Sequence, residues 1–170
     1  MFLTNRRIVL IGVIGTIVLT IIFLPQIAFY ANAPDVDQIT ISLSDVAVSN
    51  ILNNTKNVEL LVTFDIHNPS DKSATTSKIE YELFGNDKSL GNGILSFEDI
   101  PLNGRPQFSP DTTKSLDSLI LLTPMDSNMD IIDQLINNQS NSEFIDWSTH
   151  GTIQLESAFI ATQKTFNDEL

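Results

Sequence analysis

Residues 57–68 read NVELLVTFDIHN and hold the clearest structural pattern in the 170-residue sequence. Apolar residues occupy every second position, at Val58, Leu60, Val62, Phe64 and Ile66. A period of two is typical of a β-strand with one buried face and one face in water. Such strands favour antiparallel sheets, because the strands of parallel sheets are covered on both faces.

Two shorter stretches alternate in the same way, at 39–43 and 79–83, and further apolar runs lie at 94–97, 116–121 and 153–160. The segments between them contain Asn, Gly and Pro, which favour turns through side-chain hydrogen bonds, positive φ or a locked φ. These turn segments are Asn53-Asn54, Asn68-Pro69-Ser70, Gly85-Asn86-Asp87, Asn103-Gly104, Ser109-Pro110-Asp111 and Thr123-Pro124. Six to eight short strands predict an all-β, antiparallel sandwich of the immunoglobulin or fibronectin-III type.

One short helix is predicted between the strands, in the segment MDIIDQLINN that begins at Met129. Ser127 and Asp130 have the spacing of a capping box. Ile132 and Ile136 follow Met129 at helical spacing. We expect this helix to cover one open end of the sandwich.

The amino-terminal segment has a different pattern, because no charged residue occurs from residue 8 to residue 34. About 20 apolar residues are enough for a helix to cross a bilayer, so residues 8–30 are predicted to form a single transmembrane helix. Arg6 and Arg7 precede this segment, whereas Asp35 and Asp37 follow it. Because positive flanks stay inside, we expect a single-pass protein of the cell membrane with a cytoplasmic amino terminus and an extracytoplasmic carboxy-terminal domain.

Two alternatives remain open for this segment. Ala31-Asn32-Ala33 matches the pattern of a signal-peptidase site, so the segment could be a cleaved signal peptide. Gly12 and Thr16 lie four residues apart and would allow close helix–helix contact in a larger membrane complex. The expected organisation is a cytoplasmic end (1–7), the span (8–30), a linker (31–35), the sandwich (36–166) and a tail (167–170).

Composition excludes several classes of function. The chain has no Cys, which removes disulfides, thiolate nucleophiles, iron–sulfur clusters and Cys-type zinc sites. The part after residue 34 carries 7 Lys and Arg against 21 Asp and Glu, a net charge of −14. That charge argues against nucleic acid as a partner, because phosphate binding needs clustered cations. Asn53 and Asn138 lie in N-x-[ST] sequons and are possible glycan sites.

No residue set predicts catalysis, a cofactor, a metal ion or a small-molecule substrate. His67 lacks an orienting carboxylate paired with a nucleophile, and His150 lacks two further metal ligands. The acidic groups Asp126, Asp130 and Asp133, and Asp35 with Asp37, do not have the spacing of a calcium loop. The segment Gly91-Asn92-Gly93 predicts a strand start or a bulge and not a dinucleotide fingerprint.

An ordered set of motifs nevertheless resembles a known family. The strand at 57–68 runs into Asn68-Pro69-Ser70, and a strand with Tyr81, the pair Gly91 and Gly93, Gly151 and finally Phe166 follow in order. This set resembles the water-stress and hypersensitive-response (WHy) domain of the folded, atypical late embryogenesis abundant proteins (group 2). The family's usual Asn-Pro-Asn is replaced here by Asn-Pro-Ser.

The resemblance implies an antiparallel sandwich, a role in desiccation and other stress tolerance, and no enzymatic site. It also implies a structural role for the motif residues Asn68, Pro69, Ser70, Tyr81, Gly91, Gly93, Gly151 and Phe166. The function expected from the whole sequence is therefore a membrane-anchored, non-catalytic module that binds or protects a protein client. The alternatives are an accessory structural subunit of a larger membrane complex and, less favoured, a hydrolase with paired carboxylates.

Overall fold

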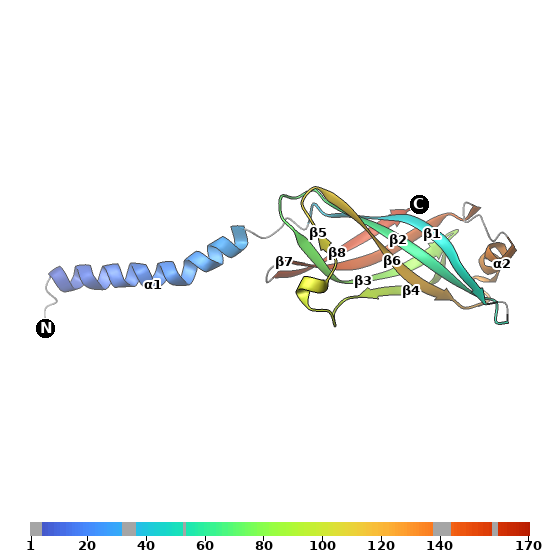
Figure 1. Ribbon diagram of the computed structural model, residues 1–170, viewed down its shortest axis with the longest axis horizontal. Coiled ribbons are helices and arrows are strands. Elements are labelled where there is room, and N and C mark those ends of the chain that lie inside the picture. The colour runs from blue at the N-terminus through green and yellow to red at the C-terminus, as the bar shows by residue number, and fades with distance from the viewer. Residues whose placement is uncertain (1–4, 32–36, 53, 138–143, 158–159) are drawn as a thin grey trace. The chain divides into compact units, whose positions relative to one another are not determined.

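A computed structural model describes residues 5–31, 37–52, 54–137, 144–157 and 160–170 (Figure 1). The chain divides into two compact units, Met1–Ala33 and Pro34–Leu170. Several predicted features lie outside the described residues. They are the sequon residues Asn53 and Asn138, most of the pattern Ala31-Asn32-Ala33, Asp35, and residues 158–159 of the last apolar run.

The first unit contains one helix, α1 (Asn5–Ala31), with Pro25 near its end. Its large apolar side chains from Val9 to Leu24 are exposed. The structure confirms the predicted amino-terminal helix but not its assignment as a transmembrane helix over residues 8–30. Among the described residues, no helix satisfies both the length and the apolar character of a membrane span.

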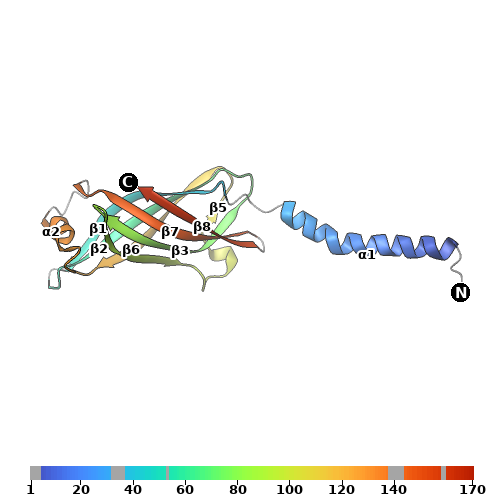
Figure 2. The same ribbon diagram turned by 180° about the vertical axis from the view of Figure 1, so that it is seen from behind.

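The second unit consists of two antiparallel sheets, which confirms the predicted sandwich (Figures 1 and 2). The first sheet has the order β1 (Thr40–Leu52), β2 (Asn57–Asn68) and β6 (Thr112–Leu122). The second has the order β4 (Lys88–Ser96), β3 (Ala74–Gly85), β7 (Trp147–Ser157) and β8 (Ile160–Glu169), with β5 (Gln107–Phe108) beside β3. A short 3₁₀ helix, η1 (Leu102–Gly104), lies between β4 and β5.

Strand β2 forms the centre of the first sheet, as its alternation predicts. Its five apolar side chains, Val58, Leu60, Val62, Phe64 and Ile66, are all 0% exposed. Full burial of one such side chain is worth about 1.5–3 kcal/mol. The period of two in this strand therefore supplies one wall of the hydrophobic core.

Strand β6 buries only part of its predicted apolar run. The predicted run 116–121 does form a strand, but its buried positions are Leu116, Ser118, Ile120 and Leu122. Leu119 and Leu121 point the other way and are 57% and 53% exposed. An unbroken apolar run has no period of two, so the sequence did not define which leucines face the core.

The predicted helix is present as α2 (Met129–Asn137) and covers one end of the sandwich (Figure 1). It buries Ile131, Ile132 and Leu135. The predicted capping box is wrong, because Asn128 and not Ser127 directly precedes the helix. The Asn128 carbonyl accepts from the Ile131 and Ile132 amides, and its side-chain oxygen accepts from the Met125 amide at 2.8 Å.

Candidate functional site

The motif residues at the end of β2 form a buried turn around the Asn68 side chain, which is 0% exposed. Asn68 Nδ2 donates to the carbonyl oxygens of Lys72 at 2.8 Å, Phe108 at 3.0 Å and Ser109 at 3.4 Å. Asn68 Oδ1 accepts from the Ser70 amide at 3.1 Å and from Ser70 Oγ at 2.7 Å. One amide side chain thus joins the segment after β2 to the segment between β5 and β6.

The neighbours of Asn68 complete this turn. Ser70 is buried, and its hydroxyl also lies 3.0 Å from the Lys72 carbonyl oxygen. Pro69 is exposed, and its ring limits φ where the chain leaves the first sheet. Asn is suited to this position because its side chain both donates and accepts hydrogen bonds. These hydrogen bonds place Asn68 and Ser70 within the crossing from β2 to β3.

A second group of motif residues forms one row across the five-stranded sheet. Tyr81 of β3 is paired with Gly93 of β4 on one side and with Gly151 of β7 on the other. Gly151 is in turn paired with Phe166 of β8. The row therefore alternates between glycine and an aromatic residue over four adjacent strands.

Each glycine leaves space for the neighbouring ring. A Cβ atom built at Gly93 would overlap the Tyr81 ring. A Cβ atom built at Gly151 would lie 2.5 Å from Cζ of Phe166 and 2.5 Å from the Glu80 carbonyl oxygen. A Cβ atom cannot lie so close to its neighbours unless the ring or the backbone moves. Gly93 and Gly151 are thus steric requirements of this row, which we call the glycine–aromatic row (Gly93, Tyr81, Gly151 and Phe166).

The rings of this row contact the opposite sheet through Phe64 of β2. The ring centroids of Phe64 and Tyr81 are 4.8 Å apart at an interplanar angle of 68°. Phe64 and Phe166 are 5.7 Å apart at 76°. Edge-to-face pairs of this kind add about 0.5–1.5 kcal/mol to the effect of burial alone.

The Tyr81 hydroxyl is also part of the interface between the sheets. It donates to Oγ of Ser118 on β6 at 2.9 Å, and both residues are buried. Burial raises the pKa of the Tyr81 phenol, and the Ser118 hydrogen bond partly opposes this shift. The phenol is therefore neutral at physiological pH and acts as a hydrogen-bond donor.

Gly91 lies outside the row and has a separate role. Its φ of +139° belongs to a region that L side chains rarely adopt. It pairs with Leu83 at the point where the register between β3 and β4 shifts. This is the bulge predicted for Gly91-Asn92-Gly93.

The outer face of the same sheet has a shallow hollow of about 320 Å³ behind the glycine–aromatic row. Its lining includes Glu80, Glu82, Ile94, His150 and Thr152. Ser89 Oγ donates to Glu82 at 2.5 Å, and the His150 ring lies 5.0 Å from the Phe84 ring. These contacts assign no nucleophile or acid–base pair to the hollow.

The other candidate residues for chemistry are dispersed. His67 Nδ1 lies 3.2 Å from Thr113 Oγ1, whereas Asp65 accepts from Ser115. In the described part of the chain, no three His, Asp or Glu side chains gather as metal ligands. Asp130 and Asp133 form ion pairs with Lys88 at 2.6 Å and Lys56 at 3.3 Å. The Lys88 ammonium lowers the pKa of the Asp130 carboxyl.

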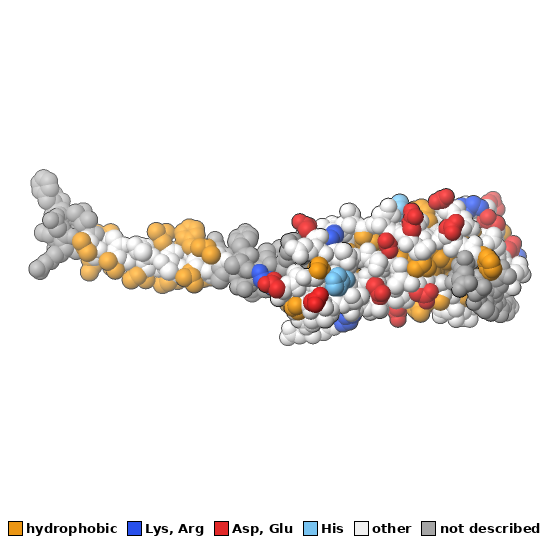
Figure 3. Space-filling view, turned by 90° about the horizontal axis from the view of Figure 1, so that it is seen from above, with side chains coloured by type: hydrophobic (Ala, Val, Ile, Leu, Met, Phe, Trp, Pro, Cys, Tyr) orange, Lys and Arg blue, Asp and Glu red, His pale blue; other side chains and the backbone are white. Residues whose placement is uncertain are grey.

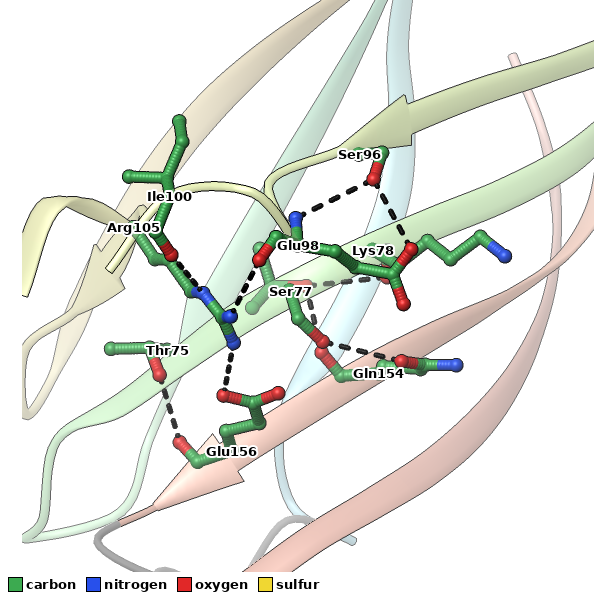
Figure 4. Close-up of polar contacts among 10 residues, drawn as sticks. Thr75, Ser77, Lys78, Ser96, Glu98, Ile100, Arg105, Gln154 and Glu156 are labelled. Carbon is green, nitrogen blue, oxygen red and sulfur yellow. Dashed lines mark hydrogen bonds and ion pairs between the residues drawn. The ribbon is translucent and has the colours of Figure 1, made fainter. Parts of the chain in front are cut away.

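Sequence reasoning missed the polar cluster around Arg105 (Figure 4). Arg105 Nη1 lies 2.5 Å from Glu156 Oε2, while Nε and Nη2 donate to the carbonyl oxygens of Ile100 at 2.8 Å and Glu98 at 3.1 Å. Arg105 thereby ties the loop after β4 to β7, beside a hollow of about 190 Å³. The only sequence signal was that no other arginine follows residue 7.

Comparison with known proteins gives matches in structure and none in sequence. No protein-family profile matches the chain, and no curated protein matches it. The AT1g01470 protein from Arabidopsis thaliana has 14% sequence identity and a TM-score of 0.50, with 76% of this chain and 79% of that chain covered.

Two other solved structures are similar at lower scores. A protein from Archaeoglobus fulgidus has 13% identity and a TM-score of 0.43, covering 75% of this chain and 94% of its own. At2g46140.1, described as a late embryogenesis abundant protein, has 12% identity and a TM-score of 0.37, covering 92% of this chain and 84% of its own. At these identities the likeness is one of fold. This chain thus shares its fold with AT1g01470 over about three quarters of its length, and membership of the WHy family stays a prediction from the motif residues.

Proposed function

We propose that this chain is a non-catalytic module that binds or protects other proteins under water stress. Its sandwich has the late embryogenesis abundant and WHy type of fold, and its strand order supports the finer assignment to the immunoglobulin and fibronectin-III group. The family resemblance of the motif residues motivates the stress role. A fold alone does not imply a function, so the proposal needs support from the residues themselves.

The proposal rests mainly on one observation: the side chains of the motif residues make their contacts within the sandwich. Asn68 and Ser70 form hydrogen bonds within the buried turn. Tyr81 and Phe166 form ring contacts with Phe64 of the opposite sheet. The outer surface remains available to a partner, and on the face shown in Figure 3 acidic side chains predominate over basic ones. A surface with a net charge of −14 stays hydrated and resists self-association.

A client-protection assay tests this proposal. The full chain is purified in a mild nonionic detergent, which covers the exposed apolar side chains of α1, and is added to a heat-labile enzyme before heating or drying. We expect the client to retain more activity than it does with an unrelated acidic protein in the same detergent. Equal loss of activity with both proteins contradicts the proposal.

A second function is supported by helix α1. Its apolar side chains are exposed, and a Cβ atom at Gly12 or Gly15 would meet nothing within 4 Å. Such a surface suits contact with other helices, as in an accessory subunit of a larger assembly. Gentle extraction followed by size analysis distinguishes the two functions, because a single monomeric species excludes a stable assembly.

The location of the sandwich outside the cell stays a prediction from the charges that flank residues 8–30. Lys114 is exposed on β6 and is a suitable reporter. Labelling of Lys114 by a membrane-impermeant amine reagent in intact cells supports the extracytoplasmic location. Labelling only after the cells are opened contradicts it.

A further inference from the structure

The outer face of the three-stranded sheet carries two different surfaces. One row across the strands consists of Asp45, Thr63 and Asp117, and Asp65 lies in the adjacent row. The rows on the other side pair Leu61 with Leu119, and Glu59 with Leu121. We call the first surface the acidic half (Asp45, Asp65 and Asp117) and the second the leucine half (Leu61, Leu119 and Leu121).

The leucine half is largely exposed. Leu119 and Leu121 are 57% and 53% exposed, and Leu61 is half-buried between them and β1. Neighbouring apolar side chains on one strand face form a contiguous patch, unlike single exposed leucines. A partner that covers this patch gains apolar burial.

Among the described residues, no ion pair includes an aspartate of the acidic half. The ion pairs of the described residues are Lys56–Asp133, Lys78–Glu80, Lys88–Asp130 and Arg105–Glu156. Asp117 instead accepts from Thr63 Oγ1 at 2.9 Å, and Asp65 accepts from Ser115 Oγ. With no ion pair to a described Lys or Arg, these carboxylates favour a basic partner.

The two edges of this sheet are not equivalent. At the β1 edge, Lys164 Nζ of β8 donates to the Asp37 carbonyl oxygen at 2.7 Å, and Asp168 Oδ2 accepts from the Leu43 amide at 2.8 Å. At this edge, charged side chains of β8 therefore form hydrogen bonds with backbone groups of β1 and of the segment before it. Among the described strands, β6 forms a backbone ladder with β2 alone, and β4 of the opposite sheet contacts it by packing only. The backbone groups on the outer edge of β6 can therefore pair with a further strand.

We propose that a basic, partly apolar segment of a partner protein adds as an extended strand along β6. This inference rests on the proposed binding function and names the surface and the partner's chemistry. Since alternate residues of a strand share a face, the segment would place two apolar residues beside Leu121 and Leu119 and a Lys or Arg beside Asp117. Backbone pairing supplies affinity, and these side chains supply specificity.

A second copy of this chain fits less well. Antiparallel pairing of two β6 strands centred on Leu119 would place each Asp117 opposite a Leu121. The net charge of −14 on each sandwich also opposes self-association. The same charge opposes an anionic lipid surface.

The test uses the full chain in mild detergent and a fluorescent peptide. In this peptide every second residue is Thr, and the positions between are Val, Val and Lys in that order. We expect binding that weakens with salt, measured by anisotropy. Asp117→Asn keeps the Thr63 hydrogen bond and should weaken binding about two- to fivefold, the range of an exposed ion pair. Leu119→Ser with Leu121→Ser should weaken it by about tenfold.

Matched controls separate this surface from the rest of the molecule. Ile94→Ser removes an apolar side chain that is 59% exposed on the other sheet, and Asp126→Asn removes an exposed acid outside the strands. Both variants should bind the peptide as the parent does. Equal losses in the control and test variants overturn the proposed surface.

A second measurement separates strand addition from charge attraction. Two peptides are compared, one N-methylated at its odd-numbered residues and the other at its even-numbered residues. Each loses the backbone N–H donors on one edge of the strand. We expect one of the two methylated peptides to lose binding and the other to keep it. Equal binding of both peptides, a chain that dimerises through β6, or binding to anionic vesicles overturns the proposal. Client protection in the absence of peptide binding contradicts this inference alone and leaves the proposed function standing.

Discussion

The ring of Tyr81 on β3 occupies the space that a side chain at its cross-strand partner Gly93 on β4 would need. Tyr81 is 3% exposed, and its hydroxyl is held by Ser118 of the opposite sheet. The ring therefore cannot move outward without loss of a buried hydrogen bond and of its contact with Phe64. Glycine at position 93 is thus a packing requirement and not a source of flexibility.

Substitution Gly93→Ala should destabilise the sandwich by about 1–3 kcal/mol, the cost of overpacking a core. Urea unfolding of the full chain in detergent measures the effect. Asn92→Ala, at the exposed neighbouring position, is the matched control and should change stability little. Equal stability of the two variants contradicts the steric role of Gly93.

Tyr81 should ionise at a higher pH in the folded chain than in the unfolded chain. Burial raises the pKa of Tyr81 above its ordinary value of 10.0. The unfolded chain therefore loses the phenol proton first, and the free energy of unfolding falls as pH rises from the unfolded pKa through the folded one. Stability should therefore fall at alkaline pH. The dependence of the unfolding midpoint on pH should be weaker in Tyr81→Phe, whereas identical pH profiles refute the shift.

Loss of the Asn68 side chain should be among the most destabilising single changes. Asn68→Ala leaves buried carbonyl oxygens of the turn without donors and should cost about 2–4 kcal/mol. Asn68→Asp should also destabilise, because a carboxylate cannot donate to these carbonyls. Pro69→Ala is the control, with an expected loss below about 1 kcal/mol. Chemical denaturation that ranks Pro69→Ala with Asn68→Ala speaks against this turn.

The exposed pair of Asp130 and Lys88 should affect titration more than stability. The hydrogen bond from Lys88 lowers the pKa of Asp130, so its contribution exists above the unfolded value of 3.8 and is lost as pH falls through the folded pKa. In Lys88→Ala, the Asp130 carboxyl should titrate at higher pH by NMR. An unchanged titration curve shows that the pair is not formed in solution.

Local patterns in the sequence predicted the elements well, and their ends less well. The alternation of β2 and the helical spacing of α2 come from burial of one face, which acts on neighbouring residues. The residue before α2 is Asn128 and not the predicted Ser127. The Asn128 side chain forms hydrogen bonds with backbone groups of the preceding turn, which the local pattern did not predict. The leucine-rich stretch of β6 carried no periodic signal, and only its pairing with β2 showed that Leu119 and Leu121 face outward.

The sequence by itself determined the strands, most turns and the identity of the motif residues, because these depend on propensities within a few residues. Only the tertiary structure decided that Gly93, Tyr81, Gly151 and Phe166 lie in one row, and that Arg105 meets Glu156. Such contacts depend on strand register between distant segments. A shift of one residue would turn every side chain to the opposite face, so the register follows from burial of the whole core and not from any local pattern.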